Sequence, residues 1–269
     1  MMLWYTFTIL LPILLVEAQT SFQWERVDTD GYPFLPRSNF GATTVDGVAY
    51  LFGGEVNEGL GFTQLFDDLV TFQPTDLGFF TFTEVEIAAN TTKPSPRSGL
   101  SLASGDSFLV SIGGTTLAVG GEVVFASDAH WIFDLATSTW MDISESGPSP
   151  RVGATVFVSD GIVYVQGGLT IASDESALTL SDFWMYDPAI STWTILGSDF
   201  TPRSYAMSAV VGSNVYIYGG LGTGLDPLSS LVYADLDQFS LTTVEPDNAP
   251  NQLVGTYRGY GALDSGWTS

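Results

Sequence analysis

The sequence predicts an all-β protein made of small antiparallel sheets that repeat in tandem. Four times, Pro-Arg is followed 16 residues later by Gly-Gly: the arginines are Arg37, Arg97, Arg151 and Arg203, and the pairs are Gly53-Gly54, Gly113-Gly114, Gly167-Gly168 and Gly219-Gly220. A β-branched or aromatic run ends at each pair, and no stretch keeps a 3.6-residue period long enough for a helix. The arginines are 60, 54 and 52 residues apart, a period typical of repeat architectures whose units cannot bury their faces alone.

Each unit begins with a predicted hairpin. The second strands are expected at 48–52, 108–112, 162–165 and 215–218, and another apolar strand precedes each of them. The turns between them contain Asp46-Gly47, Gly105-Asp106-Ser107, Asp160-Gly161 or Gly212-Ser213-Asn214. Asp-Gly between apolar runs is the strongest short-range hairpin signal, because a type I′ turn needs positive φ at its central positions.

Two further strands complete each unit. After Gly-Gly comes a long variable loop, then an aromatic strand (131–134 and 184–187 in the clearest units), a tight turn, and a last strand that carries Trp140 or Trp193. We expect Phe80 at the place of this Trp in the first unit, and Phe239 is the nearest aromatic residue in the fourth. The glycine pairs suit a crowded position where strands converge, or a backbone with positive φ.

Units with Gly-Gly after the second strand, then aromatic-Asp and a later Trp, resemble kelch repeats, the blades of a β-propeller. The resemblance runs from residue 22 to residue 269. It implies a propeller domain at 19–269, with repeats at about 37–96, 97–150, 151–202 and 203–257, a partial repeat at 258–269, and an N-terminal strand at 22–27 that closes the final blade. Since the next Gly-Gly would fall at 274–275, we expect an incomplete ring and a longer protein, with at least one more blade and room for a C-terminal anchor. Uncovered blade edges would allow self-association.

The repeated residues have structural explanations. The four arginines are expected to satisfy carbonyl groups between blades rather than to contact a ligand. Residues 219–224 have the glycine spacing of a phosphate-binding loop, but no helix pattern follows them, so we interpret them as an ordinary loop.

Residues 1–18 are predicted to be a signal peptide. Residues 3–16 are almost entirely apolar, which suits a signal-peptide core and is short for a membrane span, and Val16-Glu17-Ala18 ends with a small residue. We expect cleavage after Ala18 and secretion; an uncleaved anchor or a buried first strand is the alternative. The chain has no cysteine, so its hydrophobic interior must stabilise it alone. Asn90-Thr91-Thr92 is the only sequon, which makes Asn90 the expected glycosylation site.

The charge balance excludes some partners. Thirty acidic and seven basic residues give a net charge of −23, which repels nucleic acid and anionic membrane surfaces, whereas cationic proteins, divalent cations and neutral glycans remain. The acidic clusters Asp28-Thr29-Asp30, Asp67-Asp68 and Asp174-Glu175 lack the spacing of a complete calcium loop. We interpret them as solvated surface and expect no metal or cofactor.

The residues also argue against several kinds of catalysis. Secreted kelch-like propellers include copper oxidases of the galactose-oxidase type, whose centre needs a Cys-Tyr pair and two histidines, but this chain has no Cys and one His. His130 lies 53 residues before Phe183 and occupies an aromatic packing position, so no catalytic residue is expected. A His130→Phe variant should keep its ligand binding.

Two functions therefore remain. The first is a secreted interaction module without catalysis that binds a protein or a neutral glycan. The alternative is a metal-independent enzyme acting on sugars, resembling the kelch-type sialic-acid mutarotases. The first is favoured because the chain has only three Lys or Arg residues besides the four repeated arginines, namely Arg26, Lys93 and Arg258. An acidic sugar would therefore find few cationic side chains to bind. A glycan array and a mutarotation assay would separate the two.

The expected binding surface follows from strand alternation. The loops after the second strands, at 55–67, 115–128, 169–181 and 221–230, should gather on one face, and loops on a rigid scaffold commonly carry recognition. The candidate binding residues are Glu55, Asn57, Phe62, Glu122, Phe125, Asp174, Glu175 and Asp226.

Overall fold

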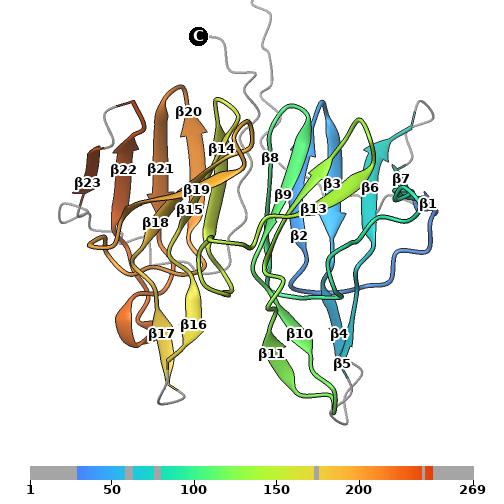
Figure 1. The fold of residues 1–269 in the computed structure, drawn as a ribbon, viewed down its shortest axis with the longest axis horizontal. Coiled ribbons are helices and arrows are strands. Elements are labelled where there is room, and N and C mark those ends of the chain that lie inside the picture. The colour runs from blue at the N-terminus through green and yellow to red at the C-terminus, as the bar shows by residue number, and fades with distance from the viewer. Residues whose placement is uncertain (1–28, 58–62, 76–79, 173–175, 238–239, 245–269) are drawn as a thin grey trace, which may run out of the picture.

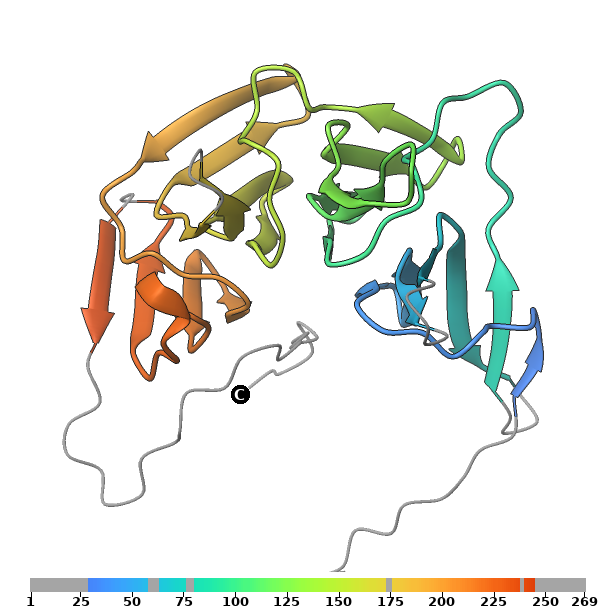
Figure 2. The same cartoon turned by 90° about the horizontal axis from the view of Figure 1, so that it is seen from below.

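Each sequence repeat forms one four-stranded antiparallel sheet, and the four sheets stand side by side as blades of a β-propeller (Figures 1 and 2). The computed structural model describes residues 29–57, 63–75, 80–172, 176–237 and 240–244. Figure 2 shows the blades following one another along an arc, with the first and the fourth blade at its two ends. The predicted all-β, kelch-type architecture is confirmed.

The first two blades have the same strand order, from the inner edge outward. The first blade contains β2 (Gly41–Val45), β3 (Val48–Phe52), β6 (Leu69–Pro74) and β7 (Phe80–Glu84). The second contains β8 (Ser101–Ser104), β9 (Phe108–Ile112), β12 (His130–Asp134) and β13 (Thr139–Asp142).

The last two blades repeat this order. The third contains β14 (Thr155–Ser159), β15 (Ile162–Gln166), β18 (Phe183–Asp187) and β19 (Thr192–Gly197). The fourth contains β20 (Met207–Val211), β21 (Asn214–Tyr218), β22 (Leu231–Asp235) and β23 (Ser240–Val244). In the described part of the chain, no helix has the length and apolar character needed to cross a membrane.

The turn chemistry of the sequence is reproduced in the backbone. Asp46 and Gly47 have φ of 50° and 77°, and Asp160 and Gly161 have φ of 49° and 75°, as a type I′ turn requires. All four Gly-Gly pairs have positive φ throughout, between 60° and 109°. An L side chain rarely adopts this conformation, which explains why glycine recurs at both positions.

The apolar faces of the sheets are buried between neighbouring blades. Phe52 and Leu69 of the first blade pack with Leu109 and Trp131 of the second. Similar clusters join the second blade to the third and the third to the fourth. Each blade therefore depends on its neighbour for burial, which is the reason repeats of this kind occur in arrays.

The outer-strand tryptophans connect each blade to the preceding one. Trp140 packs on Phe52 at a ring-centroid distance of 4.9 Å, and Trp193 donates its indole N–H to the carbonyl of Ile143 at 2.6 Å. In the first blade the residue at this register is Phe82, opposite Phe72, so the expectation for Phe80 was wrong. Phe82 lies ten residues after Phe72, against seven from Phe133 to Trp140, because β6 and β7 each extend one residue further towards their turn and the connection between them is one residue longer.

The corresponding position in the fourth blade is Leu241, opposite Ala234; Phe239 lies outside the described residues. The same holds for the predicted signal peptide at 1–18, the closing strand at 22–27 and the partial repeat at 258–269. The first described strand, β1 (Thr29–Gly31), runs parallel to β7 at the outer edge of the first blade.

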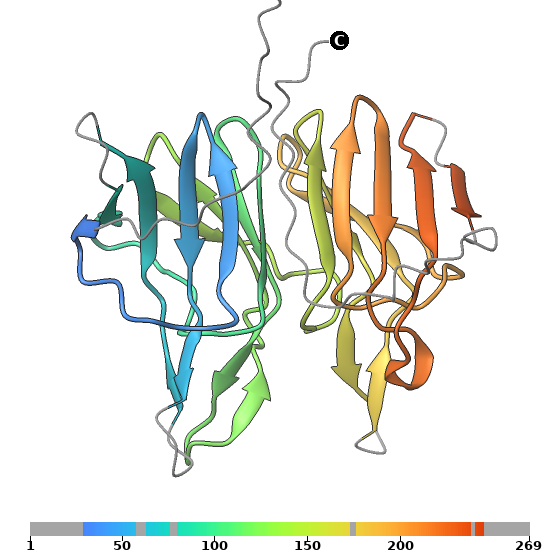
Figure 3. The same cartoon turned by 180° about the vertical axis from the view of Figure 1, so that it is seen from behind.

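The loops after the second strands are more regular than expected. In three blades they form two-stranded ribbons: β4 (Glu55–Asn57) with β5 (Thr63–Leu65), β10 (Thr115–Leu117) with β11 (Val123–Phe125), and β16 (Leu169–Ile171) with β17 (Ala177–Thr179). The fourth blade has a 3₁₀ turn, η1 (Thr223–Leu225), at this place. All four project from the same side of the propeller, which we call the ribbon face (Figures 1 and 3).

Candidate functional site

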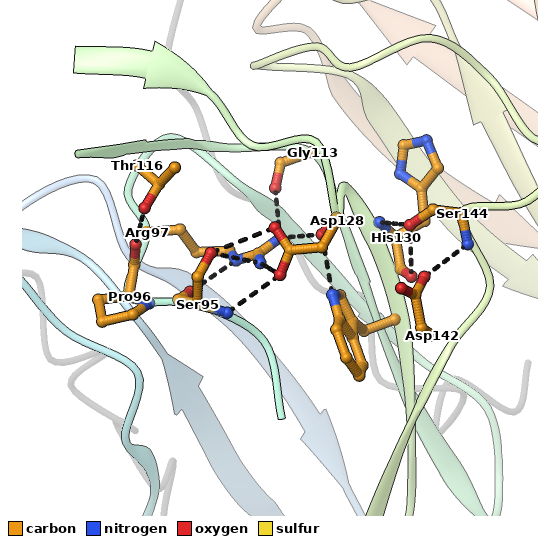
Figure 4. Close-up of polar contacts among 10 residues, drawn as sticks. Ser95, Pro96, Arg97, Gly113, Thr116, Asp128, His130, Asp142 and Ser144 are labelled. Carbon is orange, nitrogen blue, oxygen red and sulfur yellow. Dashed lines mark hydrogen bonds and ion pairs between the residues drawn. The ribbon is translucent and has the colours of Figure 1, made fainter. Parts of the chain in front are cut away.

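The repeated arginine is the centre of a buried clamp inside its own blade. In the second blade Arg97 is fully buried, and its guanidinium donates to the carboxylate of Asp128 at 2.7 Å, to the carbonyl of Asp128 at 2.8 Å and to the carbonyl of Gly113 at 3.4 Å (Figure 4). Asp128 also accepts from the backbone N–H and the hydroxyl of Ser95. Burial lowers the pKa of Arg97, while Asp128 opposes that shift.

The other blades repeat the clamp. Arg37 pairs with Asp68, and Arg151 pairs with both oxygens of Asp182 at 2.7 and 2.8 Å. In the fourth blade Arg203 donates to the hydroxyl of Ser230 and to the carbonyl of Gly219. The sequence-based reasoning did not identify these partners, although the three aspartates all lie 31 residues after their arginine, a spacing as regular as that of the glycine pairs.

The connection between blades uses the backbone. We expected the guanidinium groups to bridge blades, but they bond within one blade, and the arginine carbonyl makes the bridge. In the first three pairs, the second glycine donates its N–H to the arginine carbonyl of the next repeat: Gly54 to Arg97 at 2.9 Å, Gly114 to Arg151 at 2.8 Å and Gly168 to Arg203 at 2.8 Å. Because the side chains are enclosed, the arginines hold the scaffold together and are not presented to a ligand.

His130 is an interior residue. It is fully buried at the start of β12, its Nε2 lies 2.8 Å from the carbonyl of Pro148, and its ring centroid is 5.7 Å from that of Trp193. Burial lowers its pKa to about 4, and the nearby positive charges of Arg151 and Arg97 act in the same direction. Since the neutral imidazole donates to a carbonyl in a closed environment, this residue contributes to packing.

The ribbon face carries a concentration of exposed apolar side chains. Val119 at the tip of the second ribbon is fully exposed, Val123 is 60% exposed, and Ile171 in the third ribbon is 50% exposed. Leu117, Val124, Leu178 and Leu225 are further exposed apolar residues of the same projections. These residues were not among those predicted from the sequence, which are mostly charged, although apolar residues in segments outside the four repeated strands were a usable signal.

The predicted binding residues are spread over this face. Glu55 is half-buried at the base of the first ribbon, Glu122 and Asp226 are exposed on separate projections, and Phe125 is half-buried in β11. Asn57 lies in β4. Phe62, Asp174 and Glu175 lie outside the described residues. Of the described candidates, only Glu55 also lines the central cavity.

The central cavity lies between the innermost strands β2, β8, β14 and β20 and has a volume of about 640 Å³. Small and hydroxyl side chains make up most of its wall, among them Ala42, Ser101, Ala154 and Ser208. Of the described residues that line it, none is Lys, Arg or His, and Glu55 is the one charged side chain. The cavity is therefore open, mildly polar and negative at one point.

The acidic clusters do not assemble into a larger carboxylate group among the described residues. Asp68 belongs to the clamp with Arg37, and Asp67 pairs with Lys93 at 2.8 Å on the surface. Within the described ranges, no group of three or more His, Cys, Asp or Glu residues is placed to hold a metal ion. Asp28 and the pair Asp174-Glu175 lie outside those ranges.

The comparisons with known proteins agree with the fold. The family described as "KLHDC2/KLHL20/DRC7 Kelch-repeats domain" matches residues 13–220. Among curated proteins, the chain is 31% identical over 87 residues to an F-box/kelch-repeat protein, At1g22040, of Arabidopsis thaliana, covering 32% of this chain and 17% of that protein. It is 29% identical over 144 residues to the Rab9 effector protein with kelch motifs of Gallus gallus, covering 50% of this chain and 37% of that protein.

Among solved structures, the one titled "Structure of YjhT" superimposes with a TM-score of 0.59 at 14% identity, covering 82% of this chain and 68% of that one. At this identity the likeness concerns the fold alone. The chain spans well under half the length of either curated relative, so the activity of those whole proteins does not transfer to it.

Proposed function

This chain belongs to the kelch-repeat family, and from that premise we propose that it is a non-catalytic protein-interaction module whose ribbon face is the docking surface. The proposal goes beyond the family assignment in naming the surface and its chemistry. The Gallus gallus relative is named as an effector of Rab9, which is in keeping with a binding role for propellers of this family.

The observation that carries the proposal is the exposure of apolar side chains on the ribbons. A two-stranded ribbon that projects from the blades exposes both of its faces to water. Val119, Val123 and Ile171 are therefore solvent-exposed and do not pack in the hydrophobic core. Exposed apolar side chains gathered on the ribbons of an otherwise highly acidic protein are typical of a protein-docking site. The blades beneath are packed against one another through buried clusters, which gives the ribbons a common scaffold.

Replacing these three residues with threonine should weaken partner binding by tenfold or more, on the order of 1–2 kcal/mol in binding free energy, because apolar contact is lost while β-propensity is kept. The partner is first identified by placing a photo-crosslinking residue at position 119 and sequencing the captured protein. The dissociation constant is then measured for the wild type and for the Val119→Thr, Val123→Thr, Ile171→Thr variant.

The matched control replaces three comparably exposed apolar residues away from the ribbons, Met141, Ile190 and Ile195, with threonine. It should change the dissociation constant by less than about twofold, since exposed side chains outside an interface are near neutral. Equal losses in the two variants, or capture of the same protein by a crosslinker at position 190, would contradict the proposal.

We also propose that the protein is secreted after cleavage behind Ala18 and glycosylated at Asn90. The support is the apolar leader in the sequence and the exposure of Asn90 in a turn with φ of 64°. Protein collected from the medium of eukaryotic cells should begin at Gln19 and lose mass on treatment with an N-glycosidase, whereas an Asn90→Gln variant should not. A secreted chain that still begins at Met1 would contradict the cleavage.

A sugar-modifying activity finds less support. The central cavity would be its site, and the described residues that line it offer no cation for an acidic sugar. The structure therefore favours binding through the ribbon face over chemistry in the cavity.

A further inference from the structure

Four equivalent residues, arranged in an arc, line the central cavity at its ribbon-face end. Two positions after each repeated arginine stand Asn39, Gly99, Gly153 and Tyr205, all with φ between 54° and 69°. Their backbones form a chain of hydrogen bonds from blade to blade: Gly99 N–H to Asn39 O at 2.8 Å, Gly153 N–H to Gly99 O at 3.3 Å, and Tyr205 N–H to Gly153 O at 2.7 Å. This arc of four residues forms the mouth of the cavity.

A carboxylate stands at one end of the mouth. Glu55 immediately follows the first Gly-Gly pair, and its backbone pairs with that of Ser38. Its two carboxylate oxygens accept from the side chains of Asn39 at 2.5 Å and Ser98 at 2.9 Å, which hold the group in place without neutralising it. The equivalent residues of the other blades are Thr115, Leu169 and Leu221, so the charge at this position is confined to one blade.

An aromatic ring stands at the other end. Tyr205 adopts φ of 54°, an uncommon conformation for a bulky residue, which costs on the order of 1 kcal/mol. Asn39, the counterpart in the first blade, tolerates that conformation better. The ring of Tyr205 lies against Gly153, where a β-carbon would collide with it, and it lines the same cavity as Glu55. A strained aromatic residue at a cavity mouth is typical of a site kept for recognition.

From this arrangement we propose that the mouth of the central cavity takes a cationic side chain, arginine or lysine, from the protein that docks on the ribbon face. The inference rests on the proposed docking function and deepens it by naming the chemistry of the partner. Glu55 is the ion-pair acceptor, and the ring of Tyr205 supplies an aromatic wall on which an alkyl stem or a guanidinium can lie.

The charge and the space at the mouth both suit this ligand. No described Lys, Arg or His lines the cavity, so the negative potential of Glu55 is unopposed there, and the net charge of −23 attracts a basic partner over a longer range. Gly99 and Ala154 line the cavity with little side-chain volume, and the cavity of about 640 Å³ exceeds the volume of one side chain. A carboxylate held by neutral donors can accept a guanidinium without rearranging.

The test uses pools of nonapeptides, acetylated and amidated, with a central residue fixed as Arg, Lys, citrulline or Glu and no other charged residue. Citrulline has nearly the shape of arginine without its charge. On the full chain, retention of the Arg and Lys pools should exceed that of the citrulline pool by about tenfold, the scale of one partly enclosed charge-assisted pair. This ratio should fall to about one in Glu55→Gln and in Glu55→Thr, the latter copying Thr115 of the second blade.

The control is Asp106→Asn, which removes one negative charge from the exposed turn between β8 and β9, at the opposite end of β9 from the ribbon face. It should keep the Arg-to-citrulline ratio; a fall equal to that of Glu55→Gln would mean attraction by net charge only and would overturn the proposal. Tyr205→Asn, which copies Asn39, should lower retention of the Arg pool by about three- to tenfold without lowering the melting temperature. Unchanged retention of the Arg pool in that variant would show that the ring of Tyr205 is not part of the binding site.

The two proposals fail in different ways. If the photo-crosslinked partner loses affinity in the ribbon variant but the peptide pools show no preference for Arg or Lys, the cation site is wrong and the docking surface stands. If the pools show the preference and its dependence on Glu55, but no protein is captured at position 119, the cation site stands and the docking surface is wrong.

Discussion

Replacing Asp182 with alanine should lower the free energy of unfolding by about 3–5 kcal/mol, because it leaves the guanidinium of Arg151 buried without its countercharge. Arg151 is fully buried and donates two hydrogen bonds to Asp182, whose carboxylate also accepts from the indole N–H of Trp184 at 2.7 Å. The loss is measured by urea-induced unfolding followed by tryptophan fluorescence.

Two variants make this measurement specific. Asp182→Ser copies Ser230, the residue that accepts from Arg203 in the fourth blade, and should lose less stability than Asp182→Ala because a hydroxyl acceptor is kept. Lys93→Ala breaks the exposed pair with Asp67 and should cost less than about 1 kcal/mol. If Asp182→Ala costs no more than Lys93→Ala, the clamp is not a major source of stability.

The second large effect is a dependence of stability on pH that originates at His130. The pKa of His130 is about 4 in the folded protein and 6.5 when unperturbed, so between these values the unfolded chain binds a proton that the folded chain does not. His130 therefore has almost no destabilising effect above about pH 7 and an increasing one as the pH falls towards 4. Between pH 7 and pH 5 the loss should be about 2 kcal/mol.

The measured quantity is the difference in free energy of unfolding between the wild type and a variant at each pH. A difference is needed because the 30 acidic residues also change protonation in acid. His130→Phe copies Phe183, and His130→Leu copies Leu69, each the first residue of the third strand of its blade. Both variants should lack the about 2 kcal/mol fall, and both should keep partner binding, since His130 faces the interior. Parallel pH profiles for wild type and variants would show that His130 is not the origin.

Much of the scaffold is predictable from the sequence because its signals are local. Asp46-Gly47 and Asp160-Gly161 specify their turns through backbone conformation alone, and the glycine pairs end the second strands for the same reason. The ribbons could not be predicted in this way. Strands of three residues, such as β10 and β16, are too short to establish an alternating pattern, and their pairing depends on the blade that holds both ends.

The candidate site was predicted only in part. Strand alternation placed its loops on one side of the sheet, since that follows from connectivity. Connectivity does not predict which side chains of these loops are exposed. Val119 and Ile171 are apolar and would be assigned to the core from the sequence, but in the structure they lie on ribbons that project from the blades. Glu55 of the first blade and Tyr205 of the fourth line one cavity, a relation that no local pattern contains.

The sequence by itself determined the repeat, its four-stranded unit, its turns and its acidic character, because periodicity, backbone preference and charge belong to individual residues and their neighbours. The tertiary structure decided which distant groups meet. Arg97 and Asp128 are 31 residues apart, and only the folding of β8, β9 and β12 into one sheet brings them within 2.7 Å. Burial then makes the ion pair important for stability, because a charge removed from water is costly unless an opposite charge lies at a fixed position beside it. Only the packing of the folded chain fixes that position.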